Sequence, residues 1–186
     1  MATFVDHKLK LTYDDLRQIP EDDPFRHEVL DGVHVASPSP VYRHQTISRR
    51  IQFQLYEQIE LKGLGQVVDA PMDIELGVHD IVEPDIFVIL KDNEHIITET
   101  HVRGAPDLII EILSPSTSGR DLGTKKDRYE VSGVPEYWIV DPDAKTVAVF
   151  TLTAGARAYG TPEVHAEEIL FSARGATAEV DLTKVW

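Results

Sequence analysis

The 186-residue chain contains no cysteine, and this absence excludes three kinds of chemistry. Disulfide bonds, thiolate metal sites and a cysteine nucleophile all require the missing side chain. The 8 histidines show neither the HxxxH nor the HExxH spacing of zinc hydrolases. A glycine-rich phosphate-binding loop and a G-x-S-x-G nucleophile elbow are also absent from the sequence. A zinc hydrolase is therefore poorly supported by the sequence.

Long apolar runs are missing as well. No stretch approaches the roughly 20 apolar residues that span a bilayer, and Met1 to His7 lack the basic and apolar segments of a signal peptide. We therefore expect a cytoplasmic protein with no membrane partner. The length suits one domain over residues 1–186, with an N-terminal helical segment at 1–20 and a C-terminal strand extension at 154–186.

Basic residues are scarce, because 18 Lys and Arg face 32 Asp and Glu, for a formal net charge of −14. Proteins that hold nucleic acid through many phosphate contacts usually carry a basic surface, since counterion release drives that binding. Either nucleic acid is not the partner, or metal ions and a local basic patch overcome the field at one cleft. A solvated helix face explains the candidates for such a patch equally well; they are Arg43, Arg49, Arg50, Lys125, Lys126 and Arg128.

Apolar periodicity and turn residues predict an α/β (α+β) fold, one mixed sheet with helices against it. A short helix begins after a cap at Thr12 and ends before Pro20. Longer helices are predicted at about 42–62 and 120–132. The predicted strands cover residues 27–30, 33–36, 66–76, 82–90, 105–113, 137–140, 146–150 and one more near 168–171.

Two carboxylates interrupt otherwise apolar strands. Glu111 lies inside the apolar run 108–113, where an ionised carboxylate costs several kcal/mol unless a metal or cation compensates. Asp85 opens a second such run, 86–90. On neighbouring strands the two would offer the hard oxygen ligands that Mg²⁺ favours. The alternatives are a structural ion pair at Glu111 and an ordinary strand start at Asp85.

A cationic component is predicted on the later helix. Asp121, Lys125 and Tyr129 are spaced i, i+4, i+8 and share one helix face, whereas Lys126 lies about 100° away. If this helix packs over the end of the Glu111 strand, one lysine reaches the carboxylates and stabilises phosphorane charge or orients water. Asp121 and Tyr129 are then accessory residues. The alternative is an exposed Asp121–Lys125 pair that supports the helix.

These segments resemble a known family. Pro84-Asp85 followed by Glu111 on an apolar strand is similar to the PD-(D/E)xK nuclease superfamily. More narrowly, residues 104–117 and 121–142 resemble the Uma-two family of restriction-endonuclease-like proteins. The resemblance spans most of residues 10–150 and includes the Glu28 segment near the start.

The resemblance implies a restriction-endonuclease-like fold and Mg²⁺- or Mn²⁺-dependent hydrolysis of phosphodiester bonds in DNA. Carried over residue by residue, Asp85 and Glu111 would bind metal, Glu28 would join them, and Lys125 would be the catalytic lysine. A solvated hairpin carboxylate explains Glu28 equally well. We also expect a homodimer, because a two-fold pair of centres is the simplest way to cut both strands of a duplex.

The chain departs from the superfamily pattern at one position. The usual lysine lies two residues after the acidic residue, and Leu113 occupies that place. Lys125 fits the spacing of the Uma-two family best, so the departure bears on activity rather than on fold. Pro106-Asp107 is rejected as the motif dipeptide, because Asp107 is four residues from Glu111 on one strand and the motif pairs adjacent strands.

The remaining alternatives concern His44 and the type of function. His44 shares a helix stripe with Ile47 and Ile51, and we expect it to pack there rather than to face the site as an accessory residue.

A nuclease-fold protein that no longer cuts, serving as a binding or regulatory module, is the main alternative function. A carboxylate-pair hydrolase of sugars is another, but it leaves the lysine unexplained.

Overall fold

The computed structural model describes residues 9–20 and 22–186; residues 1–8 of the predicted N-terminal segment and residue 21 lie outside the described residues. The helical segments are α1 (Tyr13–Leu16), α2 (Tyr42–Leu55), η1 (Tyr56–Glu60), η2 (Lys91–Ile96), α3 (Ser118–Arg120), η3 (Asp121–Lys125), α4 (Lys126–Ser132) and η4 (Leu182–Lys184). The strands are β1 (Phe25–Leu30), β2 (Val33–Pro38), β3 (Gly65–Asp69), β4 (Ile74–Gly77), β5 (Asp80–Val82), β6 (Ile86–Leu90), β7 (Val102–Arg103), β8 (Leu108–Ile112), β9 (Glu136–Asp141), β10 (Thr146–Thr151), β11 (Glu163–His165), β12 (Glu168–Ala173) and β13 (Ala176–Asp181).

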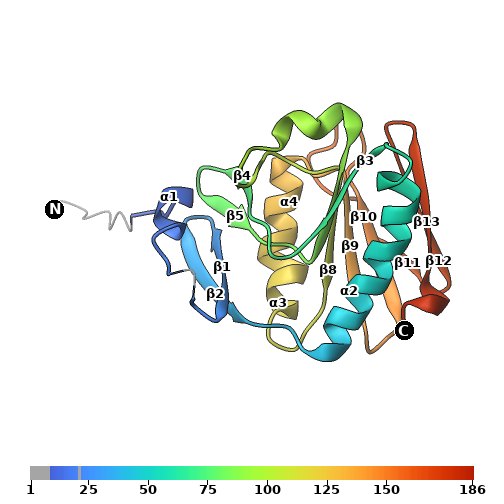
Figure 1. The fold of residues 1–186 in the computed structure, drawn as a ribbon, viewed down its shortest axis with the longest axis horizontal. Helices are drawn as coiled ribbons and strands as arrows, with labels where there is room; N and C mark the ends of the chain where they lie inside the picture. The colour runs from blue at the N-terminus through green and yellow to red at the C-terminus, as the bar shows by residue number, and fades with distance from the viewer. Residues whose placement is uncertain (1–8, 21) are drawn as a thin grey trace.

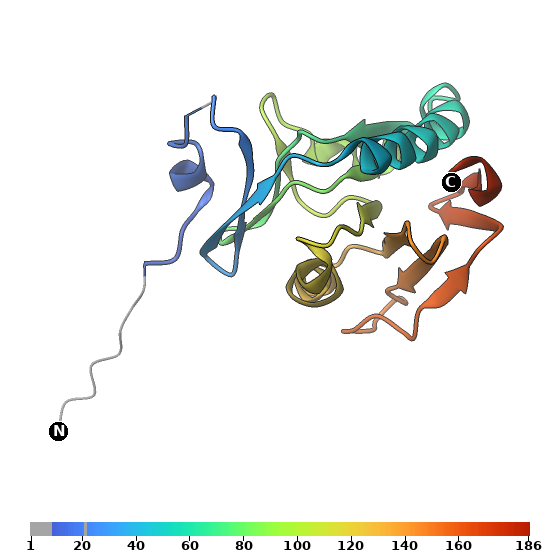
Figure 2. The same ribbon diagram turned by 90° about the horizontal axis from the view of Figure 1, so that it is seen from below.

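A six-stranded mixed sheet forms the centre of the molecule, in the order β11-β10-β9-β8-β6-β3. β8 pairs parallel with β9 and antiparallel with β6. Helix α2 covers one face of this sheet and α4 the other (Figures 1 and 2). Within the described residues, every helix is too short or too polar to cross a membrane.

Strand β8 sends alternate side chains to the two faces of the sheet. Ile110 and Ile112 pack in the cluster that contains the apolar stripe of α2, whereas Ile109 packs in the cluster that contains Tyr129 of α4. The period of two along a strand therefore directs Glu111 to the α4 side. This alternation places the carboxylate beneath the helix that carries the predicted lysine.

A second, five-stranded sheet has the order β2-β1-β5-β4-β7 and supplies one wall of the site. Its β1–β2 hairpin turns at Asp31-Gly32, as the sequence predicts. Gly32 has φ +78°, and a Cβ there would lie 2.4 Å from Lys10 Cβ, so glycine is required at this turn. Along β1, Arg26 and Glu28 share a side with buried Leu30, which belongs to the cluster under α4.

Prolines divide two of the predicted strands. The predicted strand 66–76 is two strands, β3 and β4, which belong to different sheets and are separated by the segment around Pro71. The predicted strand 82–90 likewise breaks between Val82 and Ile86, around Pro84. Proline has no N–H for a strand ladder, which is why pairing stops at both places. Because of the break at Pro84, Asp85 lies just before β6 and not inside a strand.

The predicted helices are confirmed with shifted ends. The stripe of α2 is buried as predicted and continues through one π-helical turn, η1, to Glu60. The helix predicted at 120–132 begins at Ser118, contains the π-helical turn η3, and ends at Gly133, whose φ of +80° is typical of a left-handed helix cap. At the N-terminus, the Asp15 carboxylate accepts the Thr12 backbone N–H at 2.8 Å, the predicted capping contact.

The C-terminal tail contains more structure than the single strand predicted near 168–171. It forms β11 at the edge of the large sheet and the β12–β13 hairpin, which packs on the α2 side. Gln58 donates to the Glu179 carbonyl at 2.6 Å and accepts its N–H at 2.9 Å, while Gln54 accepts the Asp181 N–H at 2.8 Å. These long-range contacts stabilise strands whose local sequence signal is weak.

Candidate active site

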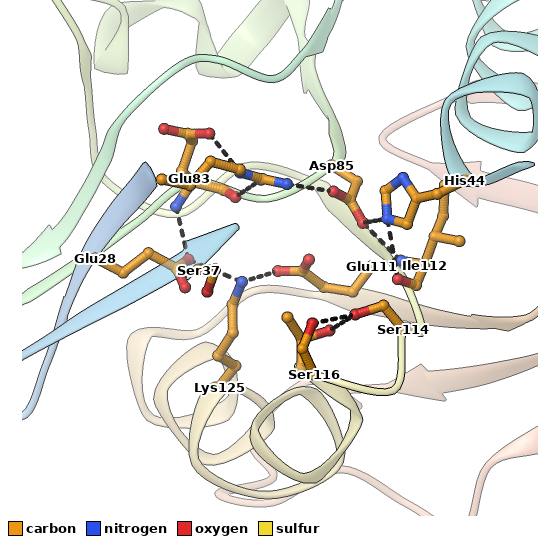
Figure 3. A network of polar contacts seen from close by, with 12 residues as sticks. Glu28, Ser37, His44, Glu83, Asp85, Glu111, Ile112, Ser114, Ser116 and Lys125 are labelled. Carbon is orange, nitrogen blue, oxygen red and sulfur yellow. Dashed lines mark hydrogen bonds and ion pairs between the residues drawn. The ribbon is translucent and has the colours of Figure 1, made fainter. Parts of the chain in front are cut away.

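Asp85 and Glu111 meet at one end of the central sheet. In the antiparallel pairing of β6 with β8, Ile86 lies opposite Ile110, so the next residues outward are Asp85 and Glu111. The prediction that they stand on neighbouring strands is confirmed. Both carboxylates are almost completely buried, with exposed fractions of 5% and 4%. Figure 3 shows them on either side of a common space.

Lys125 lies between two carboxylates. Its Nζ is 2.8 Å from Glu28 Oε1 and also contacts Glu111 Oε1 (Figure 3). Tyr129 donates its hydroxyl to the same Glu111 oxygen at 2.6 Å, and Asp121 is buried beside this group. The helix spacing therefore predicted the shared face correctly, and the alternative of an exposed Asp121–Lys125 pair is wrong.

Lys126 points away from the carboxylates. Its ammonium lies 3.7 Å from Asp127 and Glu130 and over the rings of Phe150 and Tyr159. Of the two lysines that the sequence left open, Lys125 alone reaches the site. The turn that carries it, η3, is π-helical, a rare conformation that is often found at functional sites.

Asp85 is held from three sides. Its Oδ1 accepts Arg26 Nη1 at 2.9 Å, and its Oδ2 accepts the Ile112 backbone N–H at 2.8 Å. His44 Nε2 lies 3.0 Å from Asp85 Oδ2 and 3.1 Å from the Ile112 carbonyl oxygen. The expectation that His44 only packs is therefore wrong: the first turn of α2 passes the end of the sheet, and the ring faces Asp85.

Arg26 and Glu83 are site residues that sequence reasoning missed. Arg26 Nε lies 2.6 Å from Glu83 Oε1, and the Glu83 N–H donates to Glu28 Oε1 at 2.9 Å. Arg26 lies one residue before the predicted strand 27–30, and because the observed strand β1 begins at Phe25, Arg26 shares the face of Glu28. Glu83 directly precedes the Pro84-Asp85 pair, in the break between β5 and β6, and the predicted continuous strand 82–90 gave no signal for its role.

The site holds more carboxylates than cations. Five buried acids surround two permanent cations, Arg26 and Lys125; the acids are Glu28, Glu83, Asp85, Glu111 and Asp121. The pKa of Glu111 is raised to about 8, mainly by burial, with Asp85, Asp121 and Glu28 adding to the rise and Lys125 opposing it. Although burial opposes ionisation, hydrogen bonding to His44 and the charges of His44 and Arg26 lower the pKa of Asp85 to about 2. A cation added beside these acids would favour their ionised forms and compensate the charge that burial disfavours.

The carboxylates line a recess of about 210 Å³. One rim is the segment 37–41, which covers the end of β2 and the connection to α2, and the other is the loop 114–117 between β8 and α3. The Ser114 hydroxyl is 3.0 Å from those of Ser116 and Thr117, so this loop presents a polar rim. A larger groove of about 790 Å³ between α2 and the C-terminal hairpin lies away from these carboxylates.

The predicted basic cleft does not form from the six residues proposed for it. Arg43 pairs with Asp143, Arg50 donates to the Trp186 carbonyl at 2.8 Å, and Arg128 lies 3.9 Å from Asp31 and Asp80. Arg49 lines the distant groove, and Lys126 faces Glu130. The cations at the recess are Lys125 and the unpredicted Arg26. Surface helix residues are paired locally because acidic side chains outnumber basic ones across the chain.

A family model described as "Putative restriction endonuclease", Uma2, matches residues 13–183. The chain belongs to the Uma2 family. The match confirms the resemblance that the strand, loop and helix around Glu111 indicated. The matched residues also include the C-terminal hairpin. No curated protein is similar enough to the chain to count as a match.

A solved structure shares the fold of this Uma2 protein. It is the crystal structure of a "putative nuclease belonging to DUF820" from Anabaena variabilis ATCC 29413, with a TM-score of 0.73 and 20% sequence identity. The match covers 94% of this chain and 97% of the other. The predicted fold class, a mixed sheet flanked by helices in a nuclease-like arrangement, is therefore confirmed.

Proposed function

We propose that this Uma2 protein is a divalent-metal-dependent endonuclease that hydrolyses phosphodiester bonds in DNA. The observation that supports this most is the buried excess of carboxylates around a recess that also holds Lys125. The description of the family and the name given to the structural neighbour agree with a nuclease. A sugar hydrolase built on two carboxylates does not account for the buried lysine.

The residues of the recess fit Mg²⁺ or Mn²⁺ by their chemistry. Magnesium is usually bound by one or two carboxylates, with waters and substrate phosphate completing its shell. Asp85 and Glu111 are the two carboxylates on facing strand ends, and Glu28 reaches the same space from β1. Across the residues that the structure describes, no three His, Asp or Glu side chains form a ready-made ligand cluster. Such a fit therefore relies on two protein carboxylates, the number that magnesium commonly uses.

The chain's own cations and acids have separate tasks in this proposal. When bound, Mg²⁺ would polarise a phosphoryl oxygen. Lys125 would stabilise charge that develops on the phosphate and orient the attacking water, because its ammonium lies among the same carboxylates. Arg26 keeps Asp85 ionised, and Tyr129 holds Glu111 in place. The buried position of these groups strengthens each charge interaction.

Cleavage of DNA in the presence of metal tests this function. We expect the wild-type protein to convert supercoiled plasmid and labelled oligonucleotides to shorter products with Mg²⁺ or Mn²⁺, and to stop when EDTA is added. Asp85→Asn keeps the shape of the side chain but removes its charge, so it should lose most of this activity. Wild-type protein that binds DNA but leaves all these substrates intact would instead support a non-cutting binding module.

We further propose that the protein acts as a homodimer in the cytoplasm. One recess per chain provides one active centre, and a two-fold dimer would present two centres to the two strands of a duplex. Sedimentation equilibrium at tens of micromolar should therefore give about twice the 20.9 kDa chain mass. A single species at the monomer mass over that concentration range would contradict the dimer but leave the proposed chemistry untouched.

A further inference from the structure

His44 connects a helix to both strand ends of the recess. It lies in the first turn of α2, is only 7% exposed, and belongs to neither β6 nor β8. Its Nε2 is 3.0 Å from Asp85 Oδ2 and 3.1 Å from the carbonyl oxygen of Ile112 (Figure 3). Both neighbours of this nitrogen are hydrogen-bond acceptors, so Nε2 carries the hydrogen that joins them.

The two carboxylate oxygens of Asp85 have different hydrogen-bond partners. Oδ2 faces His44 Nε2 and the Ile112 N–H, two donors for the two lone pairs of one carboxylate oxygen. Oδ1 accepts Arg26 Nη1 and has one lone pair left for a further contact. His44 thus fixes which oxygen of Asp85 remains available to the recess.

The second ring nitrogen, Nδ1, indicates that His44 does more than fill space in the core. His44 Nδ1 is buried and has no hydrogen-bond partner among residues 9–20 and 22–186. A buried polar atom without a partner destabilises the folded state, so an apolar side chain of similar size would suit the helix better. The contacts of Nε2 are what histidine supplies at this position.

We propose that His44 is a positioning residue for the metal-binding end of the site. Its Nε2–H, which also faces the Ile112 carbonyl oxygen, orients the Asp85 carboxylate so that this carboxylate keeps the direction needed by a divalent cation. Groups that orient metal ligands in this way typically change metal affinity by about 10–100-fold when they are replaced. This inference rests on the proposed metal-dependent function, but its first test does not depend on cleavage.

Three substitutions separate positioning from packing. Glutamine places its amide nitrogen near the position of histidine Nε2, whereas asparagine places it near Nδ1, and leucine fills the space without any N–H. The Mn²⁺ concentration that gives half of the maximal thermal stabilisation should rise by about 10-fold or more in His44→Asn and His44→Leu. His44→Gln should stay within about threefold of the wild type, because it restores the N–H.

A second readout is the Mn²⁺ concentration for half-maximal DNA cleavage, which should follow the same order of variants. Wild-type half-saturation in His44→Asn and His44→Leu would overturn the inference, and so would equal losses in all three variants, which indicate packing. A wild-type protein that is stabilised by Mn²⁺ but does not cut DNA would contradict the proposed function while the thermal series still decides the role of His44. A wild-type protein that shows no stabilisation by Mn²⁺ would contradict both.

Discussion

Lys125→Ala should abolish DNA cleavage and, at the same time, destabilise the folded protein. The lost ammonium acts on charge that develops in the transition state, and removing such a group costs on the order of 10²–10³ in rate. Cleavage of labelled oligonucleotides under single-turnover conditions measures this loss. Metal binding should persist in the variant, because an ammonium is not a metal ligand and competes with the cation for Glu28 and Glu111.

The loss of stability follows from the burial of Lys125, which the sequence did not reveal. A half-exposed helix lysine contributes little to stability, but Lys125 is only 3% exposed and contacts two buried carboxylates. Removing one partner of a buried ion pair typically costs about 3–5 kcal/mol, because it leaves charge uncompensated. Urea denaturation without metal should show this cost, and added Mn²⁺ should reduce it.

Lys126→Ala is the matched control, since Lys126 neighbours Lys125 but lies outside the recess, beside Glu130. Its stability should fall by less than about 1 kcal/mol, and its cleavage rate should fall only modestly. A Lys125→Ala protein that cuts at the wild-type rate would remove the lysine from the mechanism. If Lys126→Ala lost cleavage activity while Lys125→Ala kept it, the helix would be rotated so that Lys126, and not Lys125, faces the recess.

The second large effect concerns metal binding. Mn²⁺ should raise the thermal unfolding temperature of the wild type, because a ligand that binds the folded state stabilises it by mass action. Replacing both Asp85 and Glu111 by alanine should remove this shift at micromolar to millimolar Mn²⁺, because the facing carboxylates are lost. Differential scanning fluorimetry across a metal titration provides the measurement.

A double variant of exposed acids provides the charge-matched control for that titration. Glu163 and Glu168 are exposed on the C-terminal strands, away from the recess, so replacing both by alanine removes the same formal charge. The Mn²⁺ shift should remain in this control. If the Asp85/Glu111 double variant keeps the full shift, the metal binds elsewhere and the proposed ligand set is wrong.

The sequence predicted those parts of the site that depend on local periodicity. Glu111 was identified because an acid inside an apolar strand requires compensation, and the pairing of β6 with β8 placed Asp85 opposite it. The helical spacing of Asp121, Lys125 and Tyr129 predicted one buried face, which the contacts with Glu111 confirm. These signals survive folding because strand and helix geometry fix side-chain direction over a few residues.

Local periodicity failed where proline or weak strand signals governed the chain. The two predicted strands that contain Pro71 and Pro84 are broken, and the tail carries a hairpin that is bound by Gln54 of α2 and Gln58 of η1. The pairing of these glutamines with β13 joins segments more than 100 residues apart. Contacts across such distances leave no regular pattern in a single sequence.

The sequence by itself therefore determined the fold class, the two facing carboxylates and the helix face of the lysine. Tertiary structure decided which lysine enters the recess, that Glu28 joins it, and that Arg26 and His44 hold Asp85. The physical reason is that Arg26, His44 and Asp85 come from a separate sheet, a helix start and a strand end. Only packing of those elements brings their charges within hydrogen-bonding distance, and the energy of each charge depends on that burial.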